Sequence, residues 1–260
     1  MIDIHAHILP GIDDGAEDTQ EAIEMAKLAV SSGITAIVAT PHANLPGVYD
    51  NYYNKNYEES FQWLKKSFQR AEIPLQLYSG MEVFVTSDVP QLIKEGKLLT
   101  INGGRYMLVE FAFDEEPAYV KRMLKEIAEL RVIPVVAHAE RYEFLQDNPR
   151  IAMQWKELGY VVQANKGSFV GRFGRRAREV AYQLLDQNLI SVIASDCHGS
   201  YQRTPFMQEV YETLMKDYSK KQLETLFKDN PMRICHNQSL IEEGSVVTKW
   251  GIMKSTQREK

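Results

Sequence analysis

The sequence predicts an α/β protein built on a parallel β-sheet that is closed, or nearly closed, into a barrel. Short apolar segments rich in β-branched residues alternate with longer amphipathic segments along most of the chain, which is typical of βα units. Seven such units can be counted, and no linker rich in Pro, Gly or Ser separates them. A chain of 260 residues is long enough for one barrel domain. An open, doubly wound sheet is the alternative architecture.

The expected strands are mostly apolar, as strands buried on both faces of a sheet should be. They begin near seven positions: Ile2, Ile34, Leu75, Tyr106, Ile133, Tyr160 and Ile190. The clearest of the expected helices has a single apolar stripe at helical spacing, formed by Val120, Met123, Leu124, Ile127 and Leu130. Such stripes predict that the helices between the strands cover the sheet.

The sequence also predicts the local structure of three further segments. Asp18 is expected to cap a helix, with the Glu21 side chain reaching back to the cap. Residues 44–60 carry four tyrosines and little periodicity, so we expect a long loop over one end of the sheet. Residues 1–243 are expected to form a single domain, and residues 244–260 a polar C-terminal tail.

The composition excludes several classes of protein. Thirty Lys and Arg against 35 Asp and Glu give a net charge of −5, which predicts no overall basic surface for nucleic acid. No apolar run approaches the roughly 18 residues of a membrane span, and the first residues do not resemble a secretory signal. Two cysteines are too few for a disulfide scaffold. We therefore expect a soluble, cytoplasmic protein without direct membrane insertion.

Histidines and carboxylates gather at the ends of the expected strands. Five of the six histidines stand there: His5, His7, His42, His138 and His198. Four carboxylates occupy similar positions: Asp14, Glu82, Glu110 and Asp196. The carboxyl ends of parallel strands form one face of an α/β sheet, where barrel enzymes collect their catalytic groups. These nine side chains are therefore candidates for one site.

Imidazole nitrogens and carboxylate oxygens together suit Zn, Mn or Fe, and nine candidates exceed what one ion needs. In an extended segment, residues two apart point to the same face, so His5 and His7 can bind one ion, as can Asp196 and His198. Any one of these residues alone is as easily explained by hydrogen bonds to the local backbone. The whole set together predicts more than one metal ion.

These residues lie in motifs that follow one another along the chain: His5-Ala6-His7, Asp13-Asp14-Gly15, Thr40-Pro41-His42, Ala137-His138-Ala139-Glu140-Arg141 and Ser195-Asp196-Cys197-His198. With Glu82 and Glu110, the series resembles the polymerase and histidinol phosphatase (PHP) family. Within it, the chain is most similar to the capsule-type tyrosine phosphatases of the CpsB/YwqE subgroup. Glu110, where other members more often have His, the H-x-E-R run and Arg203 mark this subgroup. The resemblance runs from residue 1 to about residue 240.

The resemblance implies a distorted seven-stranded (β/α)7 barrel of the TIM-like PHP type that holds three metal ions. The implied ions are Mn, with Fe, Zn or Mg as alternatives. The ligand sets carried over are His5, His7, Glu82 and Asp196 for the first ion, Glu82, Glu110 and His138 for the second, and Asp14, His42 and His198 for the third. Asp13 competes with Asp14 for the third set, because adjacent carboxylates in a turn point in different directions.

The implied activity is hydrolysis of phosphotyrosine by a hydroxide that bridges two of the metal ions and attacks phosphorus. Arg141 and Arg203 would bind the non-bridging phosphoryl oxygens as catalytic residues. Their alternative role is an ion pair with Glu140 or Glu209. The implied partner is the tyrosine-rich tail of a membrane-associated bacterial kinase that regulates capsular or exopolysaccharide synthesis. The alternative substrates within the family are a small phosphomonoester, such as histidinol phosphate, and a nucleic-acid 3′ end.

Three details remain open at this stage. Cys197 and Arg203 have the C-x5-R spacing of the thiolate phosphatases, but the neighbouring Asp196 would raise the pKa of the thiol. The tyrosines at 49–53 could contact a substrate ring or simply hold the loop in place. Cys235 and His236 are expected to be structural.

Overall fold

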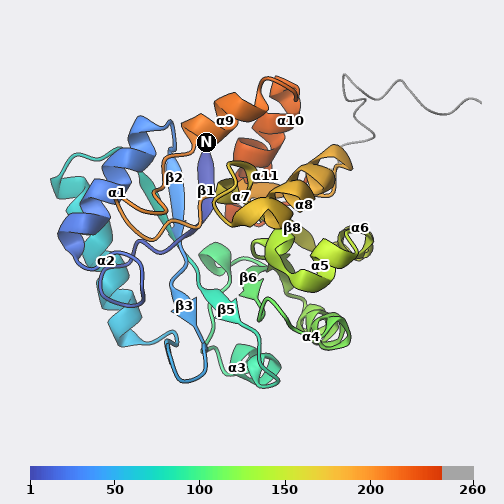
Figure 1. Ribbon diagram of the computed structural model, residues 1–260. Helices are drawn as coiled ribbons and strands as arrows, with labels where there is room; N and C mark the ends of the chain where they lie inside the picture. Colours follow the sequence, from blue (N-terminus) through green and yellow to red (C-terminus); the bar gives the residue numbers. More distant parts are fainter. Residues whose placement is uncertain (242–260) are drawn as a thin grey trace, which may run out of the picture.

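A curled parallel sheet forms the centre of the molecule, and helices lie around it (Figure 1). The computed structural model describes residues 1–241. The polar tail expected at 244–260 lies outside the described residues. The α/β class expected from the alternating segments is confirmed, and each strand pairing in the described part of the chain is parallel.

Within residues 1–241 the chain forms nine strands in two sheets. The first sheet has the order β1-β2-β4 and the second has the order β3-β5-β6-β7-β8-β9. The strands are β1 (Ile2–Ala6), β2 (Ala36–Ala39), β3 (His42–Ala43), β4 (Gln76–Ser79), β5 (Glu82–Phe84), β6 (Tyr106–Glu110), β7 (Ile133–Val136), β8 (Val161–Asn165) and β9 (Val192–Ala194). All seven expected strands are present, each starting within two residues of its expected position.

The two additional strands arise from short breaks. Thr40 and Pro41 separate β2 from β3, and Gly80 and Met81 separate β4 from β5. Proline has no amide hydrogen and therefore interrupts a ladder of hydrogen bonds. At the other side of the fold, a bridge joins Ala6 to Cys197, so the chain after β9 pairs beside β1. The sheet therefore curls back toward its own first strand.

Helices follow most of the strands and pack on the sheet. They are α1 (Thr19–Ser31), α2 (Lys55–Arg70), α3 (Val89–Lys94), α4 (Pro117–Glu129), α5 (Glu143–Asp147), α6 (Arg150–Glu157), α7 (Lys166–Phe169), α8 (Gly174–Asp186), α9 (Gln208–Leu214), α10 (Lys220–Glu224) and α11 (Asn230–Cys235). Short 3-10 turns lie at Ile101–Gly103 and Ala139–Arg141, and a π-helical turn lies at Thr225–Asp229. The apolar stripe expected on α4 is buried at Val120, Met123, Leu124 and Ile127.

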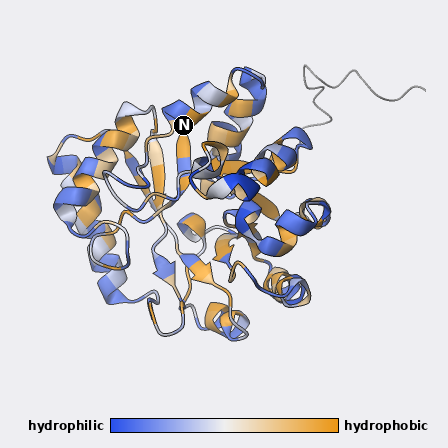
Figure 2. Cartoon of the chain, viewed as in Figure 1, coloured by the Kyte–Doolittle hydropathy of each residue, from blue (hydrophilic) through white to orange (hydrophobic). Residues whose placement is uncertain are grey.

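Apolar side chains fill both faces of the strands. Figure 2 shows apolar residues in the strands, whereas the surrounding helices carry both polar and apolar residues. One cluster of buried side chains joins the strands to α1, α2, α4 and α8, and a second joins them to Ile234 and Cys235 of α11. Burial on both faces explains why the strands read as continuous apolar runs.

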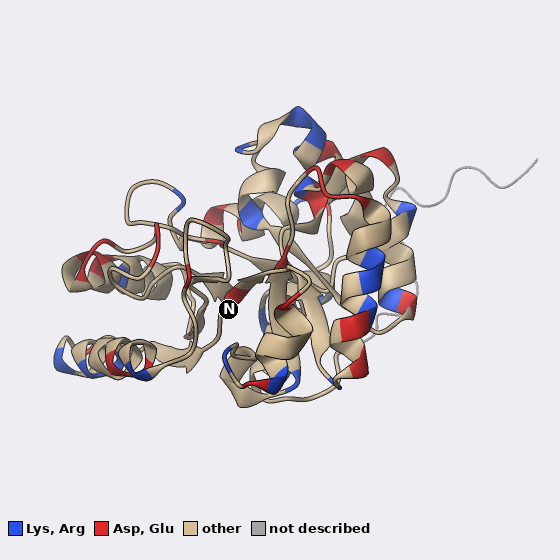
Figure 3. Ribbon diagram, turned by 90° about the horizontal axis from the view of Figure 1, so that it is seen from below, with Lys and Arg blue, Asp and Glu red and all other residues tan. Residues whose placement is uncertain are grey.

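Charged residues of both signs lie along the outer helices (Figure 3). This mixture gives the described surface no single basic stripe in that view, in agreement with the net charge of −5. Among the helices of residues 1–241, none combines the length and apolar character that a membrane span requires.

Two local expectations need correction. Residues 55–60 are not loop: they begin α2, which Asn54 caps by accepting a hydrogen bond from the amide of Tyr57. Asp18 does cap α1 through the amide of Glu21, but the Glu21 carboxylate accepts from the amide of Glu17 rather than from the cap residue. In both cases one side chain satisfies backbone amides that the first helical turn leaves free.

Candidate metal centre

The polar residues predicted at the strand ends meet at one edge of the sheet. His42 and Glu82 are the first residues of β3 and β5 and lie in register beside each other. The other seven belong to β1, β6 or the segments that follow β1, β7 and β9: His5, His7, Asp14, Glu110, His138, Asp196 and His198. Because all these strands are parallel, their carboxyl ends share one side of the sheet. The fold thus brings all nine candidates together.

Glu82 lies at the centre of this cluster and is 1% exposed. Its two carboxylate oxygens lie close to four imidazole rings: 3.1 Å from His5 Nε2, 3.1 Å from His7 Nε2, 3.2 Å from His42 Nδ1 and 3.0 Å from His138 Nε2. Burial alone would raise the pKa of the Glu82 carboxyl, but the imidazoles hold it well below its usual range. Glu82 is therefore an ionised carboxylate shared by four histidines.

His5, His7, Glu82 and Asp196 form what we call the floor of the site, and all four are buried. The Nε2 atoms of His5 and His7 lie 3.3 Å apart, and Asp196 Oδ1 lies 3.4 Å from the first and 3.7 Å from the second. His5, His7 and Asp196 each offer a donor atom within 4.8 Å of the others. The floor therefore presents converging nitrogen and oxygen donors.

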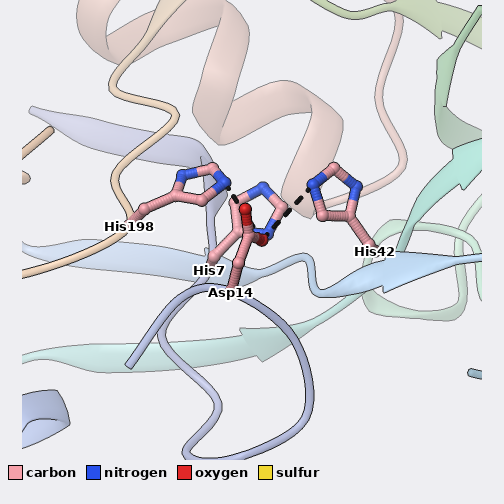
Figure 4. A group of neighbouring side chains, drawn as sticks. All are labelled: His7, Asp14, His42 and His198. Atoms are coloured by element: carbon pink, nitrogen blue, oxygen red, sulfur yellow. Dashed lines mark ion pairs between the residues drawn. The ribbon is translucent and has the colours of Figure 1, made fainter. Parts of the chain in front are cut away.

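Asp14, His42 and His198 form the rim of the site, as Figure 4 shows together with His7. Asp14 Oδ1 lies 3.6 Å from His42 Nε2 and 3.5 Å from His198 Nε2. The Asp14 side chain is 52% exposed, in contrast to the floor. The rings of His7 and His198 stack with centroids 3.8 Å apart. These four residues also have donor atoms within 4.8 Å of one another.

A third group contains Glu110. His42 Nδ1 lies 2.9 Å from Glu110 Oε1, and the two residues share a cluster of donor atoms with Glu82. His138 Nε2 lies 3.0 Å from Glu82 and 3.6 Å from Glu110. His42 thus lies between two groups, and the division of the nine residues among individual ions stays a prediction.

The structure distinguishes Asp13 from Asp14. Asp13 Oδ2 lies 2.7 Å from His7 Nδ1 and accepts from the backbone amide of His42, and its other oxygen accepts from the amide of Gly15. It therefore touches the ring nitrogen of His7 that faces away from the cluster, a position that orients a metal-binding histidine. Asp14 alone of the two presents an oxygen to the rim histidines.

Local backbone conformation places several of these groups. Gly15 lies so close to His7 that a Cβ atom there would stand 2.1 Å from the His7 carbonyl oxygen, so only glycine fits under the Asp13-Asp14 turn. His138, Asp196 and Arg203 have left-handed φ angles of 34°, 51° and 49°. Such conformations are costly for residues with side chains, and they concentrate at functional sites.

The pKa values of the histidines depend on burial and on the neighbouring carboxylates. Burial lowers the pKa of His5, His7 and His42, but the neighbouring carboxylates raise each of them to about 9. Burial and the neighbouring His7 lower the pKa of His198 to about 2. His138 Nδ1 is buried without a hydrogen-bond partner among the described residues. Five imidazoles packed around ionised carboxylates form the donor set that Mn, Fe and Zn prefer.

Both candidate arginines reach the edge of this cluster. Arg203 Nη2 lies 2.6 Å from Asp196 Oδ1, and Arg141 Nη1 lies 3.8 Å from Asp196 Oδ2. Glu140 is not the partner of Arg141: it accepts from the Asn165 amide and the Ser168 hydroxyl. Both guanidinium groups therefore pair with Asp196 of the cluster.

Cys197 does not have the properties of a nucleophile. The residue is fully buried, and burial together with the charge of Asp3 raises the pKa of its thiol to about 12. A thiolate phosphatase requires the opposite shift. The C-x5-R spacing of Cys197 and Arg203 is therefore a coincidence of sequence.

Two residues of β8 take part in the site although they were not predicted. Gln163 Oε1 lies 3.0 Å from His5 Nδ1 and accepts from the amide of His138, and Asn165 Nδ2 donates to Asp196 Oδ2 at 2.6 Å. Asn165 is the last residue of β8, so the reasoning that found the histidines could have found it, whereas Gln163 lies in the middle of the strand. These two uncharged side chains hold candidate metal ligands in place by hydrogen bonds.

Of the tyrosines at 49–53, Tyr49 lies beside the site. Its ring stacks on His42 with centroids 5.7 Å apart and planes 3° apart. Tyr52 instead donates to Asn44, and Tyr57, farther along, donates to the carbonyl of Gly80. In the segment 49–53, Tyr52 therefore forms a hydrogen bond that fixes the loop, whereas the Tyr49 ring contacts the rim.

Comparison with known proteins identifies the family of the chain. Tyrosine-protein phosphatase YwqE of Bacillus subtilis is 36% identical over 243 residues, covering 94% of each chain. Tyrosine-protein phosphatase CpsB of Streptococcus pneumoniae is 30% identical over 243 residues, covering 92% of this chain and 99% of the relative. A crystal structure from a study of YwqE and CpsB, described as unique metal-dependent tyrosine phosphatases, superposes with a TM-score of 0.86 at 36% identity, covering 94% of this chain and 97% of the other. The model of the family "Capsular polysaccharide synthesis, CpsB/CapC" matches residues 1–236, and the chain belongs to this family.

Proposed function

We propose that this protein is a metal-dependent protein-tyrosine phosphatase that hydrolyses phosphotyrosine on a protein involved in capsular or exopolysaccharide synthesis. The observation that carries the proposal is the convergence of five histidines and four carboxylates around Glu82, with two guanidinium groups at the edge. Relatives with 30% and 36% identity are named tyrosine-protein phosphatases.

We propose three divalent metal ions, with Mn as the expected metal and Fe, Zn or Mg as alternatives. The three groups of donor atoms on the floor, around Glu110 and on the rim support this number. Bound metal ions would lower the pKa of a coordinated water and neutralise charge on the phosphoryl oxygens. Their ligands would be His5, His7, Asp14, His42, Glu82, Glu110, His138, Asp196 and His198.

The remaining chemistry belongs to the residues of the chain. Arg141 and Arg203 would donate hydrogen bonds to the phosphoryl oxygens and stabilise the charge that develops there. Asp13 and Gln163 would hold the rings of His7 and His5 by their outer nitrogens. A phenolate leaving group, with a pKa of about 10, needs less help from a general acid than an alkoxide would.

We also propose how the fold is completed. If β2 with β3, and β4 with β5, each count as one passage of the chain, the nine strands make seven passages. The Ala6 to Cys197 bridge supports closure between the first and the last passage. The proposed result is a distorted seven-stranded PHP barrel in a single domain, expected over residues 1–243, of which residues 242 and 243 lie outside the described part of the chain.

The proposed partner is the tyrosine-rich tail of a membrane-associated bacterial tyrosine kinase, and the proposed compartment is the cytoplasm. The charged residues seen in Figure 3 are of both signs, and the net charge of the chain is −5, which does not favour nucleic acid as the partner. Phosphotyrosine peptides are therefore expected to be better substrates than single-stranded DNA, and also better than histidinol phosphate because the relatives are named tyrosine-protein phosphatases.

The proposal is tested by the metal content of untreated protein, measured by mass spectrometry, and by turnover of a phosphotyrosine peptide before and after chelation. We expect bound transition metal, loss of activity with the chelator and recovery on adding Mn. Cys197→Ser, with metal content intact, should retain turnover. Full activity in demonstrably metal-free protein, or loss of activity in Cys197→Ser, would refute the metal mechanism. A strong preference for histidinol phosphate or DNA would instead favour another PHP phosphoesterase.

A further inference from the structure

Arg141 lies close to two aromatic rings from different loops. Its Cζ atom is 4.2 Å from the centroid of the Phe113 ring and 4.2 Å from the centroid of the Phe173 ring. Phe113 follows β6, Phe173 precedes α8, and Arg141 ends the short turn after β7. Three separate segments of the chain therefore converge on one guanidinium group.

The two arginines are held by different means. Arg203 uses an N–H donor on Asp196 at 2.6 Å, and its Cζ atom lies 5.9 Å from the Phe173 ring. The Arg141 guanidinium has a longer, 3.8 Å ion pair with Asp196 in addition to its two ring contacts. Rings contact the faces of a guanidinium, whereas hydrogen bonds form at its edge. Two rings placed at the faces of Arg141 would therefore leave its N–H donors available.

Phe113 has further contacts that fix its ring beside the cluster. It meets His138 edge to face with centroids 5.5 Å apart, and Tyr142 at 6.0 Å. It is nevertheless 39% exposed, which is unusual for a ring whose only role is to fill a core. Phe173 contacts both arginines, so one ring lies beside two like charges that repel each other.

We propose that Phe113 and Phe173 are positioning residues that hold the Arg141 guanidinium by its faces, with its N–H edge free to donate to a phosphoryl oxygen of the substrate. This inference rests on the proposed phosphatase function. It assigns to the two rings a role in substrate binding and turnover that acts entirely through Arg141.

The test is a double-mutant cycle on metal-loaded protein. Phe113→Leu and Phe173→Leu each remove the π face but keep an apolar side chain, and each should lower kcat/KM for a phosphotyrosine peptide about tenfold. Phe113→Tyr, which restores a ring, should recover most of the loss. In an Arg141→Ala background, Phe113→Leu should cause no further loss, because its effect passes through the arginine.

A matched control is Tyr119→Leu, which removes a ring 5.2 Å from Arg122 on the outer helix α4 and should leave kcat/KM unchanged. Metal content and the unfolding midpoint of each variant identify losses caused by misfolding. A tenfold loss that persists in the Arg141→Ala background, or unchanged kcat/KM in both Leu variants, would overturn the inference.

Binding of inorganic phosphate, measured by calorimetry, separates this inference from the proposed function. Both Leu variants should bind phosphate more weakly than the unsubstituted protein, whatever the natural substrate is. If the unsubstituted, metal-loaded protein does not hydrolyse phosphotyrosine but the variants lose phosphate affinity, the proposed function fails and the role of the rings stands. Unchanged phosphate affinity in both Leu variants would overturn the role of the rings.

Discussion

The floor and the rim of the metal centre use the same residue types but compensate their charges differently. On the floor, Glu82 and Asp196 are 1% and 2% exposed, and imidazoles or arginine surround them. On the rim, the Asp14 side chain is 52% exposed and its two histidine contacts are 3.5 Å and 3.6 Å long. Water can solvate Asp14 when a partner is lost, whereas it cannot reach Glu82. Substitutions on the floor should therefore lower both stability and activity, whereas substitutions on the rim should mainly lower metal affinity.

The largest effect is expected for Glu82→Gln. An amide keeps the shape of the side chain but removes the negative charge that four imidazoles share, so we expect kcat/KM to fall about 1000-fold or more. Loss of one partner from a buried ionic network should also destabilise the fold by about 3 kcal/mol. Steady-state kinetics, metal analysis and denaturant unfolding measure the three consequences.

Glu129→Gln on the exposed face of α4 is the control, since its 3.7 Å pair with Lys125 is solvated and should contribute little. The proposed difference between floor and rim is wrong if the Glu82→Gln variant has the stability, the metal content and the kcat/KM of the unsubstituted protein.

The candidate residues of the floor could be found from the sequence because the end of a strand can be located from the residues next to it in the chain. Apolar runs locate the strands within two residues, and in a parallel sheet the residues that follow those runs must share one face. The roles of Asp13 and Asp14 could not be predicted, because they depend on a turn that packs against His7 through Gly15. Likewise, nothing near Phe173 in sequence indicates that its ring lies on Arg141, because that contact joins distant loops.

The pH dependence of metal binding is the second test. His5, His7 and His42 have pKa values of about 9 in the cluster, so at pH 7 they hold protons that a metal ion must displace. Metal affinity should therefore rise between pH 7 and 9, by about tenfold per pH unit for each proton released, and level off above pH 9. His198, with a pKa of about 2, releases none.

Calorimetric titration with Mn at pH 7, in two buffers of different ionisation enthalpy, counts the released protons. The stability of the metal-free protein should change in the opposite sense: raised histidine pKa values add stability that is complete below about pH 6.5 and is lost as the pH rises through about 9. Metal uptake at pH 7 without proton release would show that the neighbouring carboxylates do not hold protons on these rings.

The smallest effect is expected for Asp14→Asn on the rim. The amide oxygen can still face His42 and His198, and water can solvate the site, so we expect the weakest-bound metal ion to lose about tenfold in affinity while the fold keeps its stability. Excess Mn should then restore most of the turnover, which no amount of metal should do for Glu82→Gln. If Asp14→Asn instead destabilises the fold as much as Glu82→Gln, exposure does not separate the two regions. In that case the rim and the floor would stabilise the fold together, even though the ion pairs of Asp14 are as long as 3.5 Å and 3.6 Å.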